Sequence, residues 1–286
     1  MVIPNSIITI ENGRYRSSGL GDSFIGSFSG NEELTKVILG NSLKNIGDYA
    51  FFGGSQFLEI IIPDSVTKIG DYAFSTSYTR VEGKLTKVTF GKGLQTIGED
   101  AFRGNKITEL NFPSSLKEIK KTAFRYNNIQ KINFSTGLQT IGEEAFRHNA
   151  IAELNLPSSL KEIGGGAFDD NQIQSIAIPN GVTSISNYIF DYPSRHIGTF
   201  ANNPLTTVVI PASLANGEIS GQYFNERDSP TFGNISGSTI NRITIPVRMD
   251  ERTLRGIFEE AFVNFWISQN KAGGTYVKRG PIWTKE

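Results

Sequence analysis

The sequence of 286 residues contains no cysteine and only two histidines, two methionines and two tryptophans. The lack of cysteine excludes disulfides, zinc–thiolate sites, iron–sulfur clusters and thiol nucleophiles. The two histidines, His148 and His196, leave little room for a metal site or a histidine-based proton relay. We therefore expect neither a metal ion nor a cofactor.

An excess of one charge is also missing, because 28 Lys and Arg residues balance 28 Asp and Glu residues. A nucleic-acid-binding protein needs surplus cations to neutralise phosphates, so the balance argues against DNA or RNA as a partner. Apolar runs such as Ile60-Ile61-Ile62 are far too short to span a membrane. The start of the sequence does not resemble a signal peptide. We expect no membrane insertion, and we expect a monomer.

Glycine and phenylalanine are abundant, with 30 and 20 residues, and they recur at fixed places in a repeated unit. Four gapless units of 22 residues occupy 85–106, 107–128, 129–150 and 151–172. Less regular units begin at Leu34, Phe57, Ile173, Leu205 and Ile240. The sequence therefore predicts a stack of about nine coils over residues 34–250.

Each position in the unit has a physical interpretation. The opening segment, such as residues 85–90, ends in an apolar–polar alternation that is typical of a short strand. Leu94 and Ile97 are expected to point into the core, and the glycine after Ile97 is expected to allow close approach of neighbouring coils. The Ala-Phe pair that follows predicts a stacked column of buried rings, the phenylalanine spine: Phe51, Phe74, Phe102, Phe124, Phe146 and Phe168.

A column of asparagines ends the unit at Asn105, Asn127, Asn149 and Asn171. Such a column is suited to bonding backbone groups between coils, and a row that binds a ligand is the alternative. The full pattern L-x-x-I-x-h-P-x-x-L-x-x-I-G-x-x-A-F-x-x-N, where h is apolar, resembles the BspA-type leucine-rich repeat. The resemblance implies an α/β leucine-rich repeat solenoid with a short parallel sheet along one side. It also implies secretion or display on a bacterial cell surface, and a role in adhesion or host interaction.

The remaining segments complete the expected organisation. On the side opposite the sheet we expect short 3₁₀ or single helical turns around Gly98-Glu99-Asp100. Residues 1–33 fit an N-terminal cap, and residues 251–286 fit a C-terminal cap of one helix and a hairpin. The helix is expected to begin at Asp250 and run to about Ser268.

The outward positions of the strands form two columns that could bind a ligand. The charge column alternates in sign, and the second column is polar in its middle. Alternating charges also fix strand order and keep a surface soluble, so a purely structural role is the alternative. The charge column is Lys36, Glu59, Lys87, Glu109, Lys131, Glu153 and Ser175, and the second column is Ile38, Ile61, Thr89, Asn111, Asn133, Asn155, Ala177, Val209 and Thr244.

Two further sets are candidate contact residues. The arginine column, Arg103, Arg125 and Arg147 followed by Asp169, could bind an anionic polymer unless Glu99 and Glu143 pair with it. Insertions at 75–84, 191–204 and 225–239 follow the expected Ala-Phe position of their coils, and we expect them on one side of the stack. The second insertion offers Tyr192, Arg195 and Phe200 as contact anchors, and drift in tolerant loops is the alternative.

No catalytic or phosphate-binding motif is present. Asp169-Asp170-Asn171 lacks the remaining spacing of a calcium loop. We therefore expect a non-enzymatic interaction module that binds a protein or a glycan. A spacer without a ligand is one alternative, and an enzyme that uses Asp191 or Asp228 opposite a second acid is another.

Overall fold

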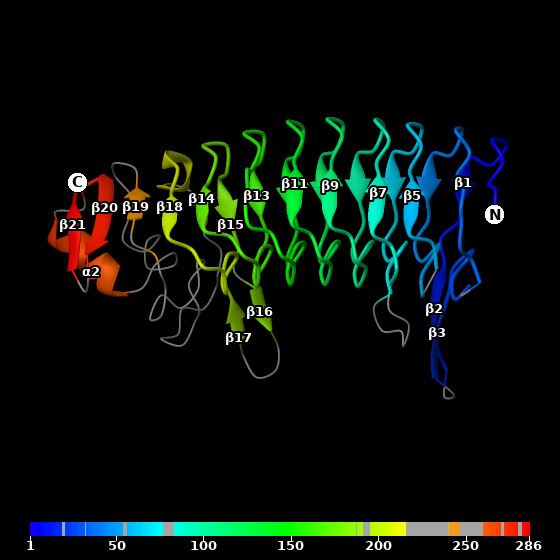
Figure 1. Ribbon diagram of the computed structural model, residues 1–286, viewed down its shortest axis with the longest axis horizontal. Coiled ribbons are helices and arrows are strands. Elements are labelled where there is room, and N and C mark those ends of the chain that lie inside the picture. The colour runs from blue at the N-terminus through cyan, green and yellow to red at the C-terminus, as the bar shows by residue number, and fades with distance from the viewer. Residues whose placement is uncertain are drawn as a thin grey trace.

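The computed structural model describes residues 1–18, 21–31, 33–53, 56–76, 83–186, 188–190, 195–215, 240, 242–245, 260–269, 272–279 and 282–286. Successive coils stack along the long axis of the molecule from the N-terminus to the C-terminus (Figure 1). Three of the four regular coils contribute one strand of three residues and one of two residues, and the coil at 151–172 contributes only the two-residue strand. The apolar side chains of these strands point inward. The chain is therefore a solenoid with one continuous core, as the repeat predicts.

The strands of three residues, together with one strand of four residues, form what we call the long-strand row. Their central residues are buried and their flanking residues exposed, which follows from the alternation in the sequence. Parallel pairing joins β5 to β7, β9 to β11, β14 to β18, and β18 to β19. The strands are β5 (Glu59–Ile61), β7 (Lys87–Thr89), β9 (Glu109–Asn111), β11 (Lys131–Asn133), β14 (Ser175–Ala177), β18 (Thr207–Val209) and β19 (Arg242–Ile245).

The two-residue strands form a second parallel sheet of eight strands, the short-strand row. Each contributes one buried isoleucine in register with its neighbours, for example Ile97 beside Ile119. The strands are β1 (Thr9–Ile10), β4 (Asn45–Ile46), β6 (Lys68–Ile69), β8 (Thr96–Ile97), β10 (Glu118–Ile119), β12 (Thr140–Ile141), β13 (Glu162–Ile163) and β15 (Ser184–Ile185).

Short turns follow this second row, in the segment that was expected to form 3₁₀ or single helical turns. The segment after Ile97 forms hydrogen-bonded turns, in which Ala101 N–H donates to Gly98 O and Arg103 N–H to Asp100 O. Asp100 has a φ of 52°, so the chain enters the left-handed region there and does not continue as a helix. Among the described residues, the 3₁₀ segment is η1 (Ala212–Ala215), which follows β18.

The phenylalanine spine is confirmed and extends further than expected. Neighbouring rings stack with centroids 5.1 to 5.5 Å apart, from Phe28 at one end to Phe200 at the other. The asparagine column bonds backbone groups between coils: Asn127 Nδ2 donates to the carbonyls of Phe102 and Phe124, and its Oδ1 accepts from Ile107 N–H. Gly98 serves close approach, because an added Cβ would lie 2.5 Å from Gly70 C.

The segment expected as an N-terminal cap itself follows the coil pattern. β1 pairs in register with β4, and Phe28 stacks on Phe51. Between Ile10 and Phe28 the chain inserts a hairpin of β2 (Arg14–Ser18) and β3 (Gly21–Ile25). Residues 1–31 therefore add one coil to the stack.

At the other end, β20 (Gly274–Arg279) pairs antiparallel with β19, and β21 (Ile282–Lys285) pairs with β20. The expected hairpin is thus present, and it extends the long-strand row. The described part of the helix is α2 (Glu260–Ser268), whose Phe262 and Trp266 are buried. The expected helix start at Asp250 lies outside the described residues.

The insertion expected at 191–204 begins earlier in the chain, with a further hairpin of β16 (Tyr188–Phe190) and β17 (Arg195–Ile197). It lies before the phenylalanine of its coil, because Phe200 and not Phe190 stacks on Phe168. The β2–β3 hairpin occupies the same place in the first coil, between Ile10 and Phe28. Both hairpins project from the same edge of the solenoid (Figure 1).

Candidate functional site

The outer surface of the long-strand row carries the candidate binding residues. The charge column and the second column are solvent-exposed along 36–38, 59–61, 87–89, 109–111, 131–133 and 153–155. Lys87 lies beside Glu59, and Lys131 beside Glu109, in the parallel register. Lys131 Nζ lies 3.6 Å from Glu109 Oε1, so the alternating signs place opposite charges on neighbouring strands.

The middle of this surface is a connected set of polar groups. Asn133 Nδ2 donates to Asn111 Oδ1 at 2.5 Å, and Asn111 Nδ2 donates to Glu109 Oε1 at 3.3 Å. Asn133 and Glu109 are exposed, and their amide and carboxylate oxygens are hydrogen-bond acceptors that a ligand could use. Glu153 and Asn155 continue both columns as exposed residues, although the segment they occupy is not a strand.

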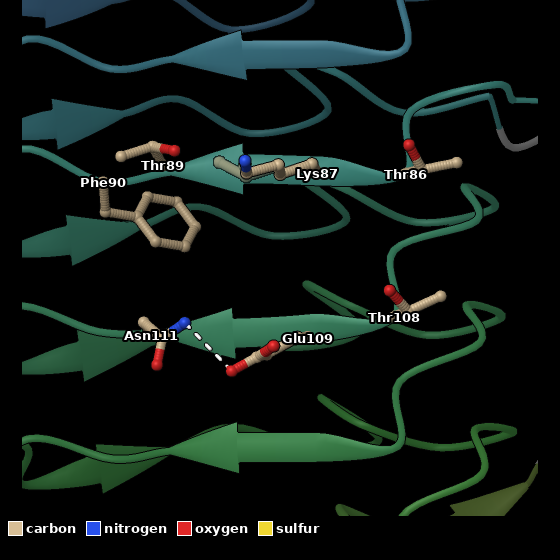
Figure 2. Close-up of a pocket in the computed structure, with 8 residues that line it drawn as sticks. Thr86, Lys87, Thr89, Phe90, Thr108, Glu109 and Asn111 are labelled. Atoms are coloured by element: carbon tan, nitrogen blue, oxygen red, sulfur yellow. Dashed lines mark hydrogen bonds between the residues drawn. The ribbon is translucent and has the colours of Figure 1, made fainter.

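A groove of about 450 Å³ lies between β7 and β9. Figure 2 shows its polar rim, with Lys87 on β7 and Glu109 on β9, and with Thr86 and Thr108 directly before these strands. Phe90 also lines the groove. The groove therefore presents hydroxyl, ammonium and carboxylate groups at the spacing of adjacent strands.

The N-terminal end of the same surface is apolar, a feature that the sequence columns contained but that we did not single out. Ile38, Leu58 and Ile61 are 49%, 59% and 66% exposed, and Val2, which bridges to Ile38, is 64% exposed. Segments 35–41 and 58–63 line a second groove, of about 680 Å³. The long-strand row is thus apolar at one end and polar and charged in its middle.

The arginine column lies in a different environment from the one expected. Arg103 pairs with Asp100 at 3.3 Å, and Arg147 contacts both Glu144 at 3.4 Å and Asp169 at 2.7 Å. Arg125 also pairs with Glu144. The three arginine side chains are only 13–16% exposed, and the three acids 1–3%.

The acids that pair with the arginines are therefore Asp100, Glu144 and Asp169, and not Glu99 and Glu143, which the sequence offered. Burial raises the pKa of the Asp169 carboxyl, and the nearby Arg147 guanidinium acts in the opposite direction. These charges compensate one another inside the edge of the stack, so the arginine column is not an open cationic stripe.

The structure describes only some of the candidate residues in the insertions. Phe200 is fully buried in the spine, which corrects its expected role as a contact anchor. Arg195 lies in β17, paired with Phe190. Tyr192, Asp191 and Asp228 lie outside the described residues, so the alternative of an acid pair in the insertions does too.

The described part of the chain was expected to hold no metal ion. It contains no group of three or more His, Asp or Glu side chains placed to hold a metal ion. His148, whose side chain is 26% exposed, stacks on Tyr126 with centroids 4.5 Å apart and pairs with Asp170 through Nδ1. None of the described helices has the length and apolar character needed to cross a bilayer.

Solved structures similar to this chain are bacterial repeat proteins. A leucine-rich repeat protein from Bacteroides ovatus is 21% identical with a TM-score of 0.53, and the match covers 87% of this chain and 67% of that one. The pneumococcal vaccine antigen PcpA is 22% identical (TM-score 0.38; 75% and 62% covered). A leucine-rich repeat protein of T. pallidum is 24% identical (TM-score 0.43; 56% and 78% covered).

These similarities concern the fold alone. No curated protein sequence matches the chain. The family model described as the BspA type leucine rich repeat region matches in six copies, over residues 24–82 and 77–197. These stretches span more than half of the chain. The chain belongs to the BspA-type leucine-rich repeat family.

Proposed function

We propose that this chain is a non-enzymatic recognition module that binds a protein or glycan ligand through the outer surface of its long-strand row. The observation that carries the proposal is the continuous exposed surface from 36 to 155. It combines ordered columns of charges and amides with an apolar end. A surface that only needed to be soluble would have no use for exposed Ile38, Leu58 and Ile61.

Family membership supports this function, because a solenoid offers an extended surface for recognition. We further propose that the chain acts in a secreted protein or at a bacterial cell surface, as the resemblance to BspA-type proteins implies. Protease treatment of intact cells, followed by detection of the chain with an antibody, tests the location. Protection from protease without detergent would contradict it.

The binding proposal is tested by screening the chain against a glycan array and a panel of extracellular proteins. Any ligand found is then measured against the double variant Asn111→Ala/Asn133→Ala. We expect at least about a tenfold loss of affinity, because the variant removes two exposed amides from the centre of the surface.

The matched control is Gln95→Ala/Gln139→Ala, which removes two exposed amides beside the short-strand row. We expect it to change affinity by less than about twofold. Equal losses for the two double variants would place the binding site elsewhere. Clean negatives in both screens would favour the alternative of a spacer domain.

A further inference from the structure

The apolar end of the long-strand row carries an inference about self-association. Ile38, Leu58 and Ile61 lie on two adjacent coils and border the 680 Å³ groove. Lys36 and Glu59 stand beside them in the charge column. A partner for this region must cover aliphatic side chains and must offer an acid to Lys36 and a base to Glu59.

A second copy of the chain meets these requirements by symmetry. A two-fold axis parallel to the strands reverses the order of coils in the partner while each column stays opposite itself. Because signs alternate along the charge column, an axis through a coil would place like charges opposite each other. An axis midway between two coils places a Lys of the charge column opposite a Glu of the partner.

The apolar residues select one of these midway axes. With the axis between the coils of Lys36 and Glu59, Ile38 faces the partner's Ile61, and Lys36 faces the partner's Glu59. Moving the axis one coil towards the C-terminus would place Ile61 against the partner's Thr89. We propose that the chain forms a two-fold dimer through this region, with Ile38 of each copy against Ile61 of the other.

An axis along the stack gives a different dimer, in which Ile38 faces the partner's Ile38. The charge column would then face the turns that follow the strands. Glu59 would approach the partner's Asp64, and Lys87 the partner's Lys92, so like charges would meet. Charge complementarity therefore favours the axis parallel to the strands.

The size of the region sets the expected affinity. The apolar region spans only the coils of Ile38 and Ile61, so we expect a contact at the low end of interface areas and a Kd on the order of 10–100 μM. Asn111 and Asn133 lie two and three coils further along the row than Ile61, outside this apolar region. The amides of the proposed ligand surface stay open in the dimer, whereas its apolar end is covered, and each dimer would present two sets of these amides for multivalent binding.

Cross-linking tests the geometry, because the chain has no cysteine of its own and each variant carries a single thiol. Ile38→Cys and Ile61→Cys are mixed near the expected Kd and oxidised. We expect disulfide-linked dimers mainly in the mixture, and few with either variant alone. Dimers of Ile38→Cys alone that form as efficiently as in the mixture would overturn the proposed axis.

Charge reversal tests the contact in the unmodified interface. Sedimentation over a concentration series is expected to show that Lys36→Glu and Glu59→Lys each weaken the dimer at least about tenfold, and that the double variant restores it. The control Lys131→Glu lies outside the overlap and is expected to leave the dimer unchanged. A wild-type chain that stays monomeric up to about 1 mM, or a double variant that does not restore association, would overturn the proposal.

Discussion

At the scale of single residues, two acids at the edge of the stack, Asp100 and Glu144, have left-handed backbone and buried side chains. Glu144 has a φ of 51°, and its carboxylate is buried between Arg125 and Arg147. Its neighbour Glu143 instead points outward and pairs with Lys121 at 3.1 Å, with both side chains about 40% exposed. Two adjacent glutamates thus carry the same charge in opposite environments.

This pair gives a matched test of the buried network. Glu144→Gln removes a charge that two arginines need, so we expect a loss of about 3 kcal/mol in the free energy of unfolding. Glu143→Gln removes a solvated pair and is expected to cost less than about 1 kcal/mol. Urea denaturation of both variants checks the difference, and equal losses would contradict the assignment of Glu144 to the interior.

The same geometry explains why the sequence named the wrong acids. A helical turn would have put Glu99 and Glu143 one turn before the arginines, which is how the column was interpreted. The left-handed residues at Asp100 and Glu144 break that spacing. Left-handed backbone in Asp, Thr, Tyr and Glu is uncommon, and no sequence pattern in the repeat indicates it.

At the scale of elements, the buried positions were predictable and the outer arrangement only partly so. Phe124, Ile119 and Asn127 recur with a fixed period, and each lies where the repeat predicts. The short-strand row was missed because a strand of two residues cannot show a period. The position of the β16–β17 hairpin was predicted wrongly because Ile189-Phe190 resembles an Ala-Phe pair. In the structure, Thr199-Phe200 occupies the position of that pair.

The hairpin gives the prediction at this scale. Deleting residues 188–197 leaves four residues between Ile185 and Phe200, the same number as between Ile97 and Phe102, and shortens the coil to a regular unit of 22 residues. We expect a folded solenoid whose free energy of unfolding changes by less than about 1 kcal/mol.

Urea denaturation and circular dichroism check the stability of the deletion. The deletion also removes Tyr192 and Arg195, so its affinity for any ligand found by screening measures the contribution of this insertion. A loss of stability as large as that caused by removing a spine ring would show that the hairpin is part of the core architecture.

At the scale of the whole molecule, the solenoid is a one-dimensional stack in which each coil contacts its neighbours. Phe124 stacks on Phe102 at 5.2 Å and on Phe146 at 5.5 Å, and the asparagine bonds run between the same coils. The regular coils at 85–172 repeat these contacts with the fewest interruptions, whereas the first and later coils carry insertions. Stability is therefore expected to be highest in the middle and to propagate through nearest neighbours.

Removing one spine ring tests this coupling. Phe124→Ala is expected to cost about 3–5 kcal/mol, because the site is fully buried and neighbouring coils hold the cavity open. Hydrogen exchange should show lost protection first between residues 102 and 146, while amides near Phe51 and Ile185 stay protected. The control Tyr126→Ala removes a ring that is 45% exposed and should cost much less. Uniform loss of protection along the chain would contradict a stack of separately coupled coils, because it would mean that the molecule opens only as a single cooperative unit.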